Sequence, residues 1–219
     1  AGYGVSLNSI CWNKNKRPSV IACMLNLLVA SVLALATYQP QDGDVIFHTC
    51  PSSQSQAIQL ATESPYSHVG VVHIRNGKPF VYEAISRVSL TPLKSWIERG
   101  QNKHFMVKRL KTRLHPTQEA KLVQEGMKYQ GLPYDLLFEW SDTKMYCSEL
   151  VWKIFKNIGL ELSPKRPMRD YRFDHPVVQK LLRDRWGNNV NWEEPMVAPS
   201  DLVDSKLLTK VYESTQPLP

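Results

Sequence analysis

The 219-residue sequence contains no internal repeat and no low-complexity block, and beyond residue 36 it has no apolar stretch long enough to cross a bilayer. These absences exclude a repeat architecture and argue against extensive disorder. Hydrophobic residues make up 42% of the chain and charged residues 21%, which is typical of a globular protein with its own core. We therefore expect one good-sized domain, with or without an extension.

Acidic residues are absent from the first 36 positions. Lys14–Arg17 are mostly basic, Val20–Leu33 are mostly apolar, and Ala34–Ala36 match a small-residue cleavage site. This order is typical of a secretory signal peptide. We predict a signal peptide or N-terminal extension at residues 1–36, a domain at residues 37–219, and a periplasmic or secreted protein. An uncleaved amphipathic or anchoring helix is the alternative.

The net charge of +7 gives little support to a nucleic-acid partner. Three of the 27 basic residues and none of the 20 acidic residues lie in residues 1–36, so the rest of the chain carries only +4. No nucleic-acid motif is present. We expect no nucleic-acid binding, and a charge of this size suits weak association with an anionic envelope surface.

Cysteine is rare, and only Cys50 and Cys147 lie beyond residue 36. In an oxidising compartment, two cysteines favour a structural disulfide. Closing the long loop between them would contribute about 4–5 kcal/mol of stability in the chain-entropy model. A Cys50–Cys147 disulfide therefore competes with any chemical role of these thiols.

Periodicity and turn residues indicate an α+β fold with strands in the middle and helices on both sides. Strands are expected at residues 44–47, 68–74, 80–85 and 105–110, and helices at residues 54–62, 91–100, 116–129, 147–158, 176–186 and 200–208. Thr91 is read as an N-cap and Pro92 as the first helical residue.

The helix that begins near Cys147 carries the strongest chemical indication. Its apolar stripe is formed by Cys147, Leu150, Val151, Ile154, Phe155 and Ile158. Unpaired N–H groups and the positive end of the helix dipole stabilise a thiolate in the first turn. Cys147 is thus a candidate nucleophile, although cysteine on an apolar stripe is also a common core residue.

A β-hairpin is predicted to orient a base for this cysteine. Asn76-Gly77 between two β-rich segments indicates a two-residue turn, in which Arg75 pairs with Lys78. That register places His68 and Glu83 on the same face, within reach of each other. A carboxylate that holds an imidazole is the orienting half of a nucleophilic triad. A purely structural His–Glu pair is the alternative.

No set of residues has the spacing of a metal site. His68 and His73 point to opposite faces of one strand, and His48 with Cys50 lacks a second pair of ligands. We therefore expect neither a metal nor another cofactor.

Five segments in this order resemble the YiiX branch of the permuted papain-like enzymes, within the NlpC superfamily. They are Gly43–Phe47 (GDVIF), Tyr66–Gly70 (YSHVG), Glu83–Ala84 (EA), Gly131–Asp135 (GLPYD) and Tyr146–Val151 (YCSELV). The resemblance begins near residue 38, continues past residue 159, and implies a circularly permuted papain-like fold. The histidine and acid then precede the nucleophile, and an antiparallel sheet packs against helices that include the nucleophile helix.

The resemblance implies that Cys147 is the nucleophile, His68 the base and Glu83 the orienting acid. Tyr134 and Tyr146 are expected to line the substrate site. Cys50 is not part of the family pattern, so the redox state of Cys147 stays open.

The first hypothesis is an exported thiol hydrolase that cleaves amide or peptide bonds through a thioester. Its substrate would be a cell-wall peptide or an acylated small molecule. A lipid-directed thiol acyltransferase or esterase, and a non-catalytic domain with a Cys50–Cys147 disulfide, are the alternatives. An apolar tunnel beside Cys147 would favour lipid chains, whereas a polar, acid-lined cleft would favour peptides.

Overall fold

A computed structural model describes residues 38–215 of the chain. The predicted signal segment at residues 1–36 lies outside the described residues. None of the helices within residues 38–215 is long and apolar enough to cross a membrane.

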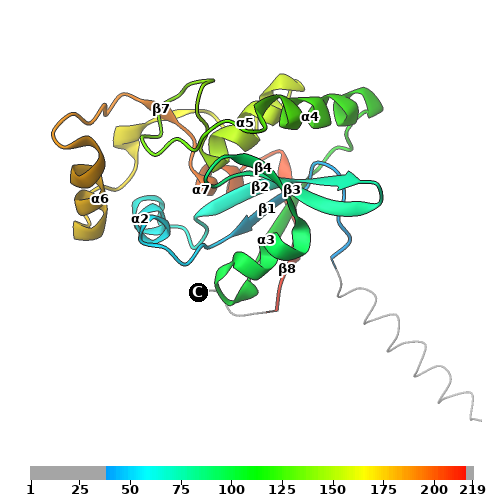
Figure 1. Ribbon diagram of the computed structural model, residues 1–219, viewed down its shortest axis with the longest axis horizontal. Helices are drawn as coiled ribbons and strands as arrows, with labels where there is room; N and C mark the ends of the chain where they lie inside the picture. Colours follow the sequence, from blue (N-terminus) through cyan, green and yellow to red (C-terminus); the bar gives the residue numbers. More distant parts are fainter. Residues whose placement is uncertain (1–37, 216–219) are drawn as a thin grey trace, which may run out of the picture. The chain divides into compact units, whose positions relative to one another are not determined.

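The centre of the described region is a six-stranded sheet in which every neighbouring pair is antiparallel. Its strand order is β4-β3-β2-β1-β5-β8 (Figure 1). The strands are β1 (Val45–His48), β2 (His68–Arg75), β3 (Lys78–Ala84), β4 (Val88–Pro92), β5 (Met106–Leu110) and β8 (Leu208–Glu213). Two short strands, β6 (Arg166–Pro167) and β7 (Pro195–Met196), pair separately.

The helices pack on this sheet and on one another. They are α2 (Ser53–Thr62), α3 (Leu93–Arg99), α4 (Pro116–Tyr129), α5 (Cys147–Asn157), α6 (Pro176–Trp186) and α7 (Pro199–Val203), with 3₁₀ turns η1 (Gln101–Lys103) and η2 (Met168–Asp170). α5 contacts β2 and β3, and α4 and α7 contact α5. α3 contacts β3 and β4, while α2 and α6 contact each other at the side of the sheet (Figure 1). The predicted α+β class is confirmed.

The hairpin between β2 and β3 has the predicted register. Arg75 pairs with Lys78, and Val71 pairs with Tyr82. Asn76 and Gly77 both have positive φ, of 52° and 72°, as the two central residues of a type I′ turn require. This turn sets which side chains of the two strands share a face.

Helix α5, which carries the candidate nucleophile, begins at Cys147 with Tyr146 as its N-cap. Its apolar stripe enters the core, where Leu150, Ile154 and Phe155 are fully buried against the sheet. Burial of this stripe fixes the rotation of α5 about its axis. The packing also holds the helix against β2, the strand that begins at His68.

Two predicted helical segments are wrong in part. Thr91 and Pro92 belong to β4, whose register pairs Thr91 with Val81, and α3 starts only at Leu93. β4 is an edge strand, so the missing N–H of Pro92 is tolerated. Near the C-terminus, α7 ends at Val203, and Leu208 instead begins β8, because pairing with β5 buries it.

Phe155→Ala should lower the free energy of unfolding by about 3–5 kcal/mol, because it leaves a cavity beneath the sheet. Phe155 is fully buried, whereas Met127 on α4 is 61% exposed. Met127→Ala is therefore the control and should change stability by less than about 0.5 kcal/mol. Urea unfolding followed by circular dichroism measures both, and equal effects would contradict this description of the core.

Candidate active site

Three elements bring a thiol, an imidazole and a carboxylate together. His68 is the first residue of β2, Glu83 lies near the end of β3, and Cys147 is the first residue of α5. The His68 Nε2 atom lies 2.7 Å from Glu83 Oε2. The shared face predicted from the hairpin register is thus observed as a buried side-chain contact.

The imidazole also interacts with the sulfur of Cys147. Burial alone would lower the pKa of His68, but hydrogen bonds with Cys147 and Glu83 outweigh it and hold that pKa well above the ordinary value. Because Nε2 faces Glu83, the other ring nitrogen, Nδ1, is left for Cys147. The arrangement favours a protonated imidazole beside the Cys147 sulfur.

The carboxylate of Glu83 is completely buried and has three side-chain partners. Thr91 Oγ1 donates to Oε1 at 2.6 Å, and Arg99 Nη2 donates to Oε2. Burial alone would raise the pKa of Glu83, but His68, Thr91 and Arg99 lower it to about 2. Glu83 therefore stays ionised and orients the imidazole ring.

Thr91 and Arg99 were not found as functional residues in the sequence. Thr91 was interpreted as a helix cap, and Arg99 lies on α3, outside the hairpin. Thr91 could have been found if residues 88–92 had been predicted as a strand. In β4, Ser89 pairs with Glu83, and Thr91 lies two positions further along, on the same face. Arg99 has no comparable local signal.

A second His–Cys pair lies beside the first. His48 Nε2 is 3.2 Å from Cys50 Sγ, and the His48 ring stacks on Trp96 with a centroid distance of 3.8 Å. Burial lowers the pKa of His48 and raises that of Cys50, so this pair favours a neutral imidazole and a protonated thiol. Cys50 and Cys147 are both free, so the structure does not contain the disulfide considered above.

The two tyrosines expected at the site lie on different sides of it. Tyr134 lines a cavity of mixed polar and apolar side chains together with His68, and its hydroxyl accepts a hydrogen bond from Gln54 at 3.0 Å. Tyr146 lines an apolar cavity together with Cys147, and its hydroxyl accepts from the Val197 N–H at 3.3 Å. Both positions adjoin the Cys–His pair, and their roles in substrate binding stay predictions.

A buried carboxylate also supports the start of α5. Glu149 accepts a hydrogen bond from the Tyr146 N–H at 3.4 Å, and its Oε1 lies 2.9 Å from Lys153 Nζ. Burial raises the pKa of Glu149 to about 7, against the opposing effect of Lys153. The three-residue spacing from Tyr146 to Glu149 resembles a capping box, and that spacing was available in the sequence.

A cysteine at a helix N-terminus, beside an imidazole that a carboxylate holds, defines a papain-like thiol site. Here the histidine and acid precede the cysteine in the chain, so the class is the permuted one. A family model described as "Permuted papain-like amidase enzyme, YaeF/YiiX, C92 family" matches residues 39–212. The chain belongs to this family, and the predicted YiiX-like, permuted papain-like fold is confirmed.

Two relatives agree with this assignment. The chain is 45% identical over 189 residues to the "Uncharacterized protein YiiX" of Escherichia coli (strain K12), covering 86% of this chain and 93% of the relative. It also matches the crystal structure of "metalloprotein yiiX" from Escherichia coli O157:H7, with a TM-score of 0.78 and 42% identity. That match covers 83% of this chain and 100% of the solved one.

Glu83→Gln should remove part of the acid dependence of stability. The pKa of Glu83 is about 2 in the folded protein, compared with an ordinary value of 4.5. The ionised carboxylate therefore stabilises the fold above pH 4.5, and this stabilisation is lost as the pH falls toward 2. The difference in unfolding free energy between wild type and Glu83→Gln should shrink by about 3 kcal/mol over this interval.

Urea unfolding at several pH values measures this difference. Glu98→Gln is the matched control, because the Glu98 side chain is 49% exposed and its nearest cation, Lys94, is 3.9 Å away. That variant should show no such pH dependence. A constant difference between wild type and Glu83→Gln would mean that the charge of Glu83 is not stabilised by its partners.

Proposed function

We propose that this protein is a thiol-dependent amidase in which Cys147, His68 and Glu83 form the catalytic triad. Its membership of the permuted papain-like amidase family supports amide-bond hydrolysis. The observation that carries the proposal is the buried contact of His68 with Glu83 at 2.7 Å, together with the position of Cys147 at the start of α5, close enough to help raise the pKa of His68. A purely structural histidine has no need of a cysteine partner at a helix N-terminus.

The reaction follows from this geometry. The Cys147 sulfur attacks the carbonyl carbon of the amide, and the Cys147 N–H at the start of α5 helps to hold the developing oxyanion. His68 protonates the leaving amine, which departs and leaves a thioester on Cys147. His68 then takes a proton from water, the resulting hydroxide attacks the thioester, and the carboxylic acid and thiolate are released.

A metal-dependent route does not fit these residues. The solved relative is titled a metalloprotein. Within residues 38–215 of this chain, no group of three or more His, Cys, Asp or Glu side chains is placed to hold a metal ion. His68 and Glu83 already bind each other, so we assign no step to a metal.

We also propose that the enzyme acts outside the cytoplasm. The support is the order of basic, apolar and small residues within positions 14–36, which is typical of an export signal. In the envelope, the substrate would be an amide- or ester-containing molecule, either a cell-wall peptide or an acylated small molecule. The 24 basic and 20 acidic residues beyond residue 36 leave a net charge of +4, which suits weak attraction to an anionic surface there.

Cys147→Ser should lower kcat/KM for amide hydrolysis by at least about a thousandfold while leaving the fold intact. Cys50→Ser is the matched control and should retain most of the activity, since burial disfavours the Cys50 thiolate. Iodoacetamide labelling at pH 6, read by mass spectrometry, should modify Cys147 ahead of Cys50. Full activity in Cys147→Ser, or none in Cys50→Ser, would contradict the assignment of the nucleophile.

Thr91→Val should reduce kcat by about tenfold, because it removes one of the donors that hold Glu83. Thr91→Ser keeps a hydroxyl and should restore most of the rate. The pKa of His68 should also fall in Thr91→Val, as Glu83 holds the imidazolium less firmly, and NMR titration of the ring measures this. An unchanged pKa together with an unchanged kcat would make Thr91 merely structural.

A further inference from the structure

The cavity beside His68 contains a second cationic side chain, Arg99. His68 begins β2 and Arg99 ends α3, and both residues line the wall of this cavity. Both side chains bind the same atom, Glu83 Oε2, so the imidazole and the guanidinium lie side by side. Glu83 itself is completely buried and is not part of the wall. The cavity therefore meets two positive groups but not the carboxylate that they share.

The guanidinium of Arg99 has donors that the protein does not use. A guanidinium carries five N–H groups in a planar fork. Within residues 38–215, the one hydrogen bond of the Arg99 side chain runs from Nη2 to Glu83, and its buried Nε has no partner. The side chain is 32% exposed, and it lines the cavity. A fork of this kind binds carboxylates through parallel N–H···O hydrogen bonds.

The rest of the wall carries no charge that would oppose an anion. Among the described residues that line this cavity, none is Asp or Glu. Several wall residues offer a hydroxyl or an amide instead: Ser52, Gln54, Ser55, Ser67 and Tyr134. Ser52 is also the N-cap of α2, so the positive end of that helix dipole adds to the same potential. The charges around this cavity therefore favour a negatively charged ligand group.

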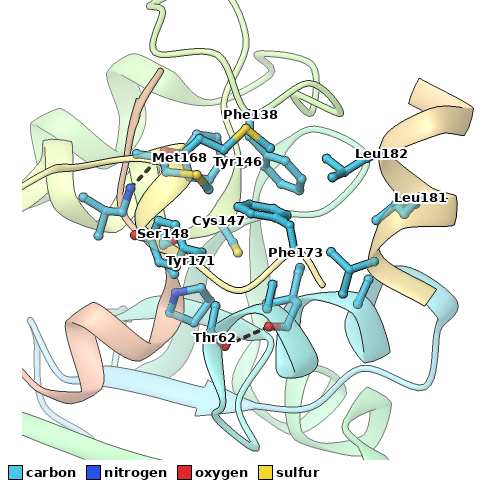
Figure 2. A pocket seen from close by; sticks show the side chains of 18 of the residues that line it. Thr62, Phe138, Tyr146, Cys147, Ser148, Met168, Tyr171, Phe173, Leu181 and Leu182 are labelled. Atoms are coloured by element: carbon cyan, nitrogen blue, oxygen red, sulfur yellow. Dashed lines mark hydrogen bonds between the residues drawn. The ribbon is translucent and has the colours of Figure 1, made fainter. Parts of the chain in front are cut away.

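Such a group has no comparable place beside the sulfur of Cys147. The cavity there is lined mainly by apolar and aromatic side chains, and Figure 2 shows the sulfur among them, with Leu181 and Leu182 on one side. No charged side chain is among the described residues of its wall. A carboxylate would lose its hydration there without gaining a partner, which is unfavourable.

The reaction decides which half of a substrate lies beside His68. The acyl half stays attached to Cys147 in the thioester, whereas the nitrogen that leaves must reach His68, its proton donor. Because His68 and Arg99 bind the same oxygen of Glu83, a substituent a few bonds from that nitrogen lies within reach of the guanidinium.

From this arrangement we propose that the amine released by the enzyme carries a carboxylate, one or two carbons from its nitrogen, and that Arg99 binds this carboxylate. The substrate class is then an N-acyl amino acid. This inference deepens the proposed function and rests on it. The carbon–sulfur bond forms as the carbon–nitrogen bond breaks, and the nitrogen takes the bonding electrons and the proton of His68. A free amino acid departs, and water then releases the acyl group as a carboxylic acid.

Binding is measured first, without turnover, by NMR titration of the full-length Cys147→Ser protein. The ligands are N-acetylglycine and N-acetyl-β-alanine, each compared with its carboxamide, which removes the charge at nearly constant shape. We expect at least one carboxylate to bind about tenfold more tightly than its carboxamide, because the amide loses a charge-assisted hydrogen bond. Equal affinities within both pairs would overturn the inference and leave the proposed function standing.

Variants made in the same background assign the preference to Arg99. Arg99→Gln should abolish it, and Arg99→Lys, which keeps the charge without the fork, should retain part of it and serves if the first variant misfolds. Thr91→Val is the matched control, because it removes another donor to Glu83 and should weaken both ligands alike. Arg172→Gln, in a side chain 57% exposed outside this cavity, should change neither affinity. An undiminished preference in the Arg99 variants would overturn the assignment.

Turnover then tests the proposed function separately, with the pair of ligands that differs more in affinity. The amine released by wild-type protein is followed by mass spectrometry. The amide of an amino acid is a less basic amine and hence the better leaving group, so faster release of the free amino acid would reflect recognition by the protein.

We expect kcat/KM to be about tenfold higher for the carboxylate, and this difference should disappear in Arg99→Gln. Amine release undiminished in Cys147→Ser would overturn the proposed function. Faster release of the amino acid amide by wild-type protein would overturn only the carboxylate inference.

Discussion

The site depends on one buried charge, the carboxylate of Glu83. A carboxylate without exposure to water is unfavourable unless its oxygens are paired, and here His68, Thr91 and Arg99 pair them. These partners come from β2, β4 and α3, so the sheet edge and the helix after it must be assembled before the charge is stabilised. The same carboxylate then aligns the imidazole with Cys147. Folding and the proposed catalysis thus use one set of hydrogen bonds.

Cys147, the proposed nucleophile, is brought to this network by the packing of α5. The apolar stripe of α5 buries Leu150, Ile154 and Phe155, and this packing determines where the first turn of the helix lies. Cys147 therefore sits where the core meets the apolar cavity, in the first turn of α5, whose backbone N–H groups have no partner within the helix.

Much of this arrangement could be predicted from local patterns. The Asn76-Gly77 turn determined the pairing of β2 with β3, and hence the contact of His68 with Glu83. Thr91 shows where such reasoning fails. The Thr91-Pro92 dipeptide is a good helix start in isolation, but pairing with β3 placed it in an edge strand. Strand pairing is decided by partners far along the chain, which a local pattern does not contain.

By itself, the sequence determined the class of the fold, the hairpin register and the bounds of α4 and α6, because periodicity, turns and caps act over a few residues. It also pointed to Cys147, His68 and Glu83 as the residues proposed to carry the chemistry. Only the tertiary structure decided how the surroundings divide into an apolar cavity beside Cys147 and a cavity of mixed character beside His68. That division is made by α2, α6 and the segments around Tyr171 and Val197, which are far apart in the chain. The physical cause is packing between helices and loops that are distant in sequence. Which side chains come into contact depends on the tertiary fold, so the sequence alone does not show it.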